Sequence, residues 1–90
     1  MMDIEILDIR PVIRGNLRAF ADVQVGAFEL HGLRIIQQPN QRPFIHFPMV
    51  EYEQGGQRLY APVIRLHDAK LEKDIKAKVL AAWQSQNQKN

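Results

Sequence analysis

The fold is decided by the stretch Leu17-Arg18-Ala19-Phe20-Ala21-Asp22-Val23-Gln24-Val25. Leucine, alanine and valine occupy every second position, and larger or polar residues occupy the positions between them. This alternation of period two is typical of a β-strand that buries one of its faces. The two alanines in the middle of the apolar face leave space for a bulky neighbour, and we expect a helix to pack against them.

Four further segments have the composition of strands: residues 4–13, 28–36, 44–50 and 58–63. Short segments rich in glycine, proline and asparagine separate them, as is usual for turns. The alternation changes phase near Leu7-Asp8 and at Gly32, so we expect β-bulges at these positions. Pro11 and Pro48 have no N–H to donate, which places Pro11 at a sheet edge or a bulge and Pro48 at a sheet edge or a bend. A hairpin loop with two glycines at its tip is predicted for residues 51–57.

Beyond residue 67 the spacing of apolar residues changes from two to about 3.6, which predicts a helix. Its apolar stripe consists of Leu71, Ile75, Val79, Ala82 and Trp83. Asp68 is expected to cap this helix, because its carboxylate can accept the unpaired N–H groups of the first turn. Leu80 lies off the stripe, and we expect it to touch a neighbouring molecule. Together these patterns predict an α+β fold: an antiparallel β-meander of about five strands with one C-terminal amphipathic helix.

Length and composition predict a single domain at residues 1–84, followed by a polar tail at residues 85–90 that frays. A chain of this size buries only about 60–65% of its unfolded surface, so we expect two copies to pair. The absence of cysteine fits a reducing cytoplasm, and no apolar run reaches the length of about 18 residues that a membrane span needs. We therefore expect a cytoplasmic protein with no membrane partner.

The positive charge of the chain is concentrated near its C-terminus. The whole chain has a formal net charge of +2, and residues 65–90 carry six Lys and Arg against three Asp and Glu. A helix with this excess of cations faces either solvent or the phosphates of a polyanion.

Residues that carry catalysis are scarce in this sequence. The histidines His31, His46 and His67 lack the spacing of metal ligands, and no cysteine is present to join them. The only serine, Ser85, lies in the predicted tail, and threonine is absent. The glycines are scattered over turns and do not form a phosphate-binding loop. We expect a binding or scaffolding module rather than an enzyme, with no metal, cofactor or small-molecule substrate.

Several short runs occur in an order and spacing similar to those of a known family. They are Ile9-Arg10-Pro11, Gly15-Asn16-Leu17-Arg18-Ala19-Phe20-Ala21, Phe28-Glu29-Leu30-His31-Gly32-Leu33-Arg34-Ile35-Ile36, Phe44-Ile45-His46-Phe47-Pro48, Gly55-Gly56 and Ala61-Pro62-Val63. In this order they resemble the SpoVG (septation protein) family of small bacterial regulators, over residues 3 to about 83. The resemblance implies a homodimer that binds DNA and RNA and regulates gene expression, with links to septum formation in cell division and to sporulation.

The resemblance also implies where nucleic acid is bound. The family associates its contacts with a basic segment just after its Met-Pro motif, to which Phe47-Pro48 is similar here, and with the start of the C-terminal helix. In this chain Met49-Val50-Glu51 follows Pro48, where the family has a serine and two basic residues. Because phosphate neutralisation dominates non-specific affinity, the loss of two cations predicts weaker binding. The cations that could compensate bracket the last strand and the helix start, and they are Arg58, Arg65, Lys70 and Lys73.

Two functions remain open at this point. The first is a dimeric nucleic-acid-binding regulator, in which cations of both copies line up along a polyanion. The second is a protein–protein interaction module that kept the fold and lost the nucleic-acid surface, which Val50-Glu51 and several apolar surface candidates favour. The candidates for the dimer interface are the apolar residues Phe20, Phe47, Met49 and Leu80.

Overall fold

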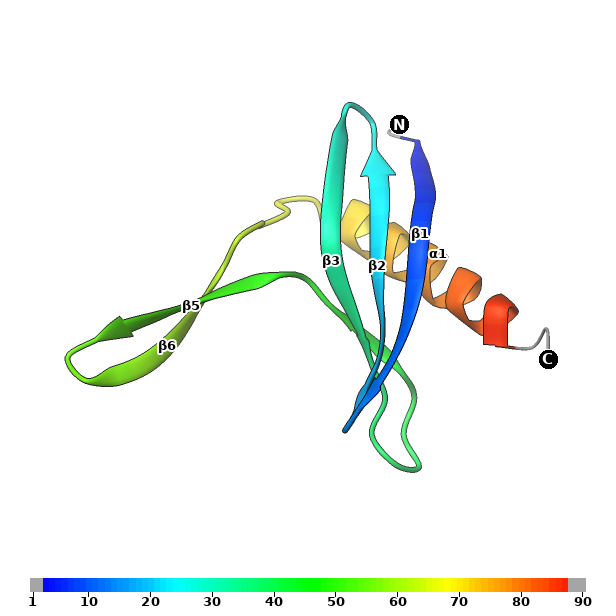
Figure 1. Ribbon diagram of the computed structural model, residues 1–90. Helices are drawn as coiled ribbons and strands as arrows, with labels where there is room; N and C mark the ends of the chain where they lie inside the picture. The colour runs from blue at the N-terminus through cyan, green and yellow to red at the C-terminus, as the bar shows by residue number, and fades with distance from the viewer. Residues whose placement is uncertain (1–2, 88–90) are drawn as a thin grey trace.

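The structure is a computed structural model and describes residues 3–87. Its elements are β1 (Ile4–Arg14), β2 (Leu17–Val25), β3 (Phe28–Ile36), β4 (Phe44–His46), β5 (Met49–Gln54), β6 (Gln57–Pro62) and α1 (Ala69–Asn87) (Figure 1). The first four strands form an antiparallel sheet in chain order, and β5 pairs with β6 in a second sheet. The predicted α+β meander with a C-terminal helix is confirmed, although the strands divide into two sheets.

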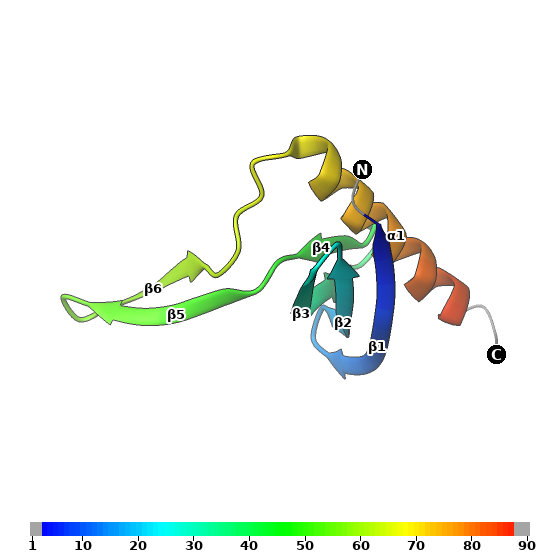
Figure 2. The same cartoon turned by 90° about the horizontal axis from the view of Figure 1, so that it is seen from above.

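One face of the four-stranded sheet is buried beneath α1. In Figure 1 the helix passes behind the strands, and Figure 2 shows the same arrangement from above. Ala19 and Ala21 are fully buried and belong to one core with Ile75, Val79 and Trp83 of the helix. The small side chains of β2 therefore provide the space that the helix occupies, as the alternation predicted.

Irregularities of the sheet lie where the sequence predicts them. The β1–β2 register shifts between Ile6 and Asp8. The β2–β3 register shifts opposite Asp22, where Gly32 has a φ of 80° that glycine adopts without steric cost. Pro11 lies on β1, an edge strand of the sheet, where a residue without an N–H is tolerated. These features confirm the predicted bulges and the predicted place of the proline.

The segment 44–50, predicted to be one strand, is divided between β4 and β5, which belong to different sheets. Pro48 lies in the break, where its fixed φ and missing N–H favour a bend over continued pairing. The predicted hairpin with Gly55-Gly56 at its tip is confirmed, but the loop is shorter than 51–57, because Glu51 to Gln54 belong to β5 and Gln57 begins β6. Both glycines have positive φ, as a two-residue hairpin turn requires.

The helix begins as predicted and extends further than predicted. The N–H of Leu71 donates to Oδ1 of Asp68 at 3.0 Å, which confirms Asp68 as the cap. Leu80 is half-buried and packs against the core of its own chain, because it borders the buried stripe. The helix includes residues 85–87 of the predicted tail. Residues 88–90 of that tail lie outside the described residues.

Replacement of Ile75 by alanine is expected to lower the free energy of unfolding by about 3 kcal/mol, because it leaves a cavity at a fully buried position. The matched control is Ile13→Ala, which removes the same atoms from a residue that is 86% exposed. The control should change stability by less than about 0.5 kcal/mol. Urea unfolding followed by circular dichroism measures both variants, and equal losses would contradict the core described here.

Candidate nucleic-acid interface

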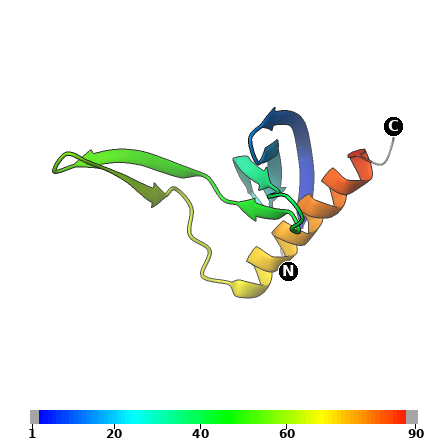
Figure 3. The same ribbon diagram turned by 90° about the horizontal axis from the view of Figure 1, so that it is seen from below.

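β5 and β6 form a hairpin that extends away from the rest of the molecule, and we call residues 49–62 the arm (Figures 1 and 3). Every residue of β5 is exposed. The register places Val50 opposite Ala61 and Tyr52 opposite Leu59, so one face of the arm is apolar. A two-stranded hairpin is only marginally stable alone in water. Within residues 3–87, no other element packs over this apolar face.

The opposite face of the arm carries charge. Nε of Arg58 lies 2.7 Å from Oε1 of Glu51, and the register also sets Arg58 opposite Glu53. Glu51 therefore compensates the charge of Arg58, one of the four cations predicted to bind phosphate. Arg58 belongs to β6, and the arm lies apart from α1 in all three views.

The other three predicted cations lie around the start of α1. Arg65 and Lys70 line the same groove beside the first turns of the helix, and Lys73 is exposed on the helix. Nζ of Lys70 lies 3.3 Å from a carboxylate oxygen of Asp74, which compensates part of its charge. The structure therefore brings Arg65 and Lys70 together, and it does not bring Arg58 to them.

Arg65 lies between the arm and α1 and lines two adjoining grooves. The first has a volume of 460 Å³, lies between β4, the base of the arm and the helix, and includes His46, His67 and Lys76. The second has a volume of 880 Å³ and follows the start of the helix, where Lys70 also lines it. The acids among the lining residues of the two grooves are Asp3, Asp68, Glu72 and Asp74. The grooves are therefore mixed in charge, with Arg65 as the cation common to both.

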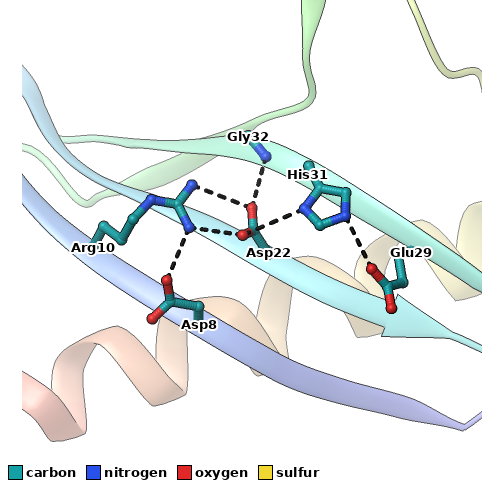
Figure 4. Close-up of polar contacts among 6 residues, drawn as sticks. All are labelled: Asp8, Arg10, Asp22, Glu29, His31 and Gly32. Atoms are coloured by element: carbon teal, nitrogen blue, oxygen red, sulfur yellow. Dashed lines mark hydrogen bonds and ion pairs between the residues drawn. The ribbon is translucent and has the colours of Figure 1, made fainter.

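The face of the sheet away from α1 carries a network of charged side chains from three strands (Figure 4). The guanidinium of Arg10 donates to the carboxylate of Asp22 at 2.7 and 3.3 Å, and to Asp8 at 2.9 Å. The N–H of Gly32 donates to Oδ1 of Asp22 at 3.0 Å. Nδ1 of His31 lies 3.4 Å from Oδ2 of the same carboxylate. Asp22 on β2 thus connects β1 with the bulge of β3.

These contacts change the protonation equilibria of the network. Hydrogen bonds from Arg10 lower the pKa of Asp22 to about 2, although its burial acts in the opposite direction. Hydrogen bonds to Asp22 and Glu29 raise the pKa of His31 above its ordinary value. Arg10 remains a cation, and the two aspartates beside it compensate its charge. This network therefore holds the sheet together and offers little free charge to a ligand.

The residues predicted for the dimer interface are spread over the molecule. Phe20 is half-buried on the sheet face away from α1. Phe47 packs against the core, and Nζ of Lys76 lies 5.6 Å from its ring centroid. Leu80 packs against the core as well, whereas Met49 is exposed at the base of the arm. Phe47 and Leu80 are therefore already packed within their own subunit.

The three histidines lie in two parts of the fold. His31 belongs to the charged network, and His46 and His67 line the first groove. In the part of the chain that the structure describes, no group of three or more His, Cys, Asp or Glu side chains is placed to hold a metal ion. The described helix is not apolar enough to cross a membrane.

The sequence did not single out Arg34 or the neighbours that the sheet gives it. The register sets Arg34 of β3 beside Phe20, and His46 of β4 beside Arg34. Alternation of period two could have assigned each of them to a face of its own strand. Which residues stand side by side depends on the offset between strands, and the bulges change that offset.

Comparison of the chain with protein-family models, with curated proteins and with solved structures found no match.

Asp22→Asn is expected to lower stability at pH 7 by about 1–3 kcal/mol, because it weakens the charge-assisted hydrogen bonds at a largely buried site. The folded pKa of Asp22, about 2, lies below its ordinary value of 3.8, so the carboxylate stabilises the fold above pH 3.8. This contribution is lost as the pH falls through the folded pKa. The variant should therefore lose stability less steeply than the wild type between pH 3.8 and about 2.

Thermal unfolding over this pH range measures the effect. The matched control is Asp8→Asn, which alters a carboxylate that contacts the same arginine but has a side chain 53% exposed. Its effect should be below about 1 kcal/mol. Identical pH profiles for Asp22→Asn and the wild type would contradict the network.

Proposed function

We propose that this chain is a SpoVG-type regulator: a cytoplasmic homodimer that binds DNA or RNA and acts on gene expression linked to septation and sporulation. The observation that supports this function best is the position of Arg65, between the arm and the helix start. It lies in the region where the resemblance implies phosphate contacts.

Phosphate binding requires cations that are not already compensated by the protein itself. Arg65 is exposed, and no carboxylate lies within ion-pairing distance of it in residues 3–87. The same is true of Lys73, which is exposed near the start of α1. Because Arg58 and Lys70 are paired with acids, one subunit offers fewer cations than its sequence predicts, and a second subunit is needed to supply the rest.

A second copy also supplies the cover that the arm lacks. In a two-fold symmetric dimer the same surface meets itself, so two arms can pack with their apolar faces together. The groove of Arg65 includes Met49 and Pro62 at the base of the arm. Pairing through the arms would therefore hold the Arg65 side chains of both subunits in one assembly.

The alternative function is a protein–protein interaction module, and one observation favours it. Three apolar residues lie exposed on or beside the apolar face of the arm, with exposed fractions of 52% for Val50, 43% for Tyr52 and 60% for Val63. On this alternative, the apolar face binds a different protein and the grooves bind no polyanion.

The double variant Val50→Asp/Tyr52→Asp is expected to convert the dimer to a monomer of 10.4 kDa, because four carboxylates would face one another across the paired arms. The control Glu51→Gln/Glu53→Gln alters the opposite face and should leave the dimer intact. Light scattering coupled to gel filtration measures the mass. A wild-type monomer would contradict the homodimer, and a dimeric double variant would show that the arms do not form the subunit interface.

The wild type is expected to bind random-sequence DNA and RNA at low salt, with log K falling against log salt at a slope of about −3 to −4 for three to five phosphate contacts. Arg65→Ala/Lys73→Ala should weaken binding and make the slope shallower by about 1 for each phosphate-binding cation removed. The control is Arg58→Ala/Glu51→Gln, which removes both charges of an ion pair and should bind like the wild type. Filter binding over a salt series measures these values, and no binding at low salt would leave the interaction module as the function.

A further inference from the structure

The sheet face away from α1 holds a row of side chains that the proposed phosphate site does not use. The register gives one residue from each strand, β1 to β4, in the order Arg10, Phe20, Arg34 and His46. Directly opposed side chains on one face of a sheet have Cβ atoms about 4.5–5.5 Å apart. Phe20 therefore has an arginine opposite it on each neighbouring strand, on the face of the sheet away from α1 (Figure 1).

This face is divided into two halves of different charge. On one half Arg34 is exposed, and no carboxylate of residues 3–87 lies within ion-pairing distance of it. The other half carries Glu5, Gln24 and Glu29, which the register sets side by side. The charged network around Asp22 lies between the halves. A polyanion is therefore favoured on the half that holds Phe20 and Arg34, and disfavoured on the other.

Two more rings lie at the edge of the favourable half. Phe44 and His46 alternate on β4, with ring centroids 5.7 Å apart and an angle of 64° between the rings. Phe44 is 39% exposed. His46 also lines the groove that contains Arg65. Through His46, the row of side chains on the sheet therefore adjoins the groove of Arg65, which is the proposed phosphate site.

We propose that this half of the sheet face binds single-stranded nucleic acid, with bases stacked on Phe20 and Phe44 and phosphates held by Arg34 and Arg65. Bases in a duplex are stacked on one another, so only an unpaired strand offers their faces to a phenyl ring. Stacking tolerates any base, because every base has a π-face. The inference rests on the proposed function and adds to it the form of nucleic acid and the place of the bases.

The test compares fluorescein-labelled oligothymidylate and oligouridylate of about 15 nucleotides with a duplex of equal length, by fluorescence anisotropy of the full chain. Phe20→Ala/Phe44→Ala is expected to weaken binding of both single strands by about 30-fold or more and to leave duplex binding unchanged. The matched control is Phe28→Ala, since Phe28 is 67% exposed at the far end of β3. It should bind single strands like the wild type.

A second variant separates stacking from folding. Phe20→Leu/Phe44→Leu keeps apolar side chains on the sheet but removes the rings, so it should bind single strands as weakly as the alanine variant. Its urea midpoint should stay near that of the wild type. If it binds single strands like the wild type, or becomes monomeric, the inference is overturned, since the face then does not stack bases or is a subunit interface.

The two proposals fail in different ways. If Arg65→Ala/Lys73→Ala loses binding while the phenylalanine variants keep it, the proposed function stands and the stacking face is wrong. If the wild type binds neither single strands nor duplex, both proposals are wrong.

Discussion

Burial of the apolar stripe of α1 against the small side chains of β2 is the interaction on which the rest of the structure depends. Ala19 and Ala21 let the helix approach closely enough for Ile75, Val79 and Trp83 to enter the core. A chain with a single helix can cover only one face of its sheet. The other face must then be compatible with water, which explains why charged and aromatic side chains occupy it.

On that face, where α1 does not pack, the charged network connects neighbouring strands through side-chain hydrogen bonds. Asp22 is buried on this face, and donors from β1 and β3 satisfy its carboxylate. A buried carboxylate without such donors would be costly. The bulge at Gly32 supplies one of these donors, so an irregularity of the backbone and a side-chain ion pair stabilise each other. On the helix side, Nζ of Lys78 donates to the carbonyl of Ile4 at 2.9 Å and joins the last element to the first.

The sequence predicted the elements better than their placement. Alternation along β2 and the stripe of α1 were sufficient for the α+β fold, because each reports one buried face directly. Pro48 predicted either a sheet edge or a bend, but nothing in the composition of residues 44–50 says that the chain leaves one sheet and enters another. The candidate cations illustrate a second limit. The pairing of Arg58 with Glu51 depends on a hairpin register that a predicted loop at 51–57 had concealed.

The arm has a further consequence, for how this protein could diversify. Its two strands hydrogen-bond to each other and not to the four-stranded sheet, and the core cluster contains none of its residues. Substitutions at the tip or on the apolar face can therefore accumulate without altering the packing that keeps the domain folded. After gene duplication, the arms of the two copies could change so that each copy pairs with itself or with the other. The four-stranded sheet and its helix would stay the same.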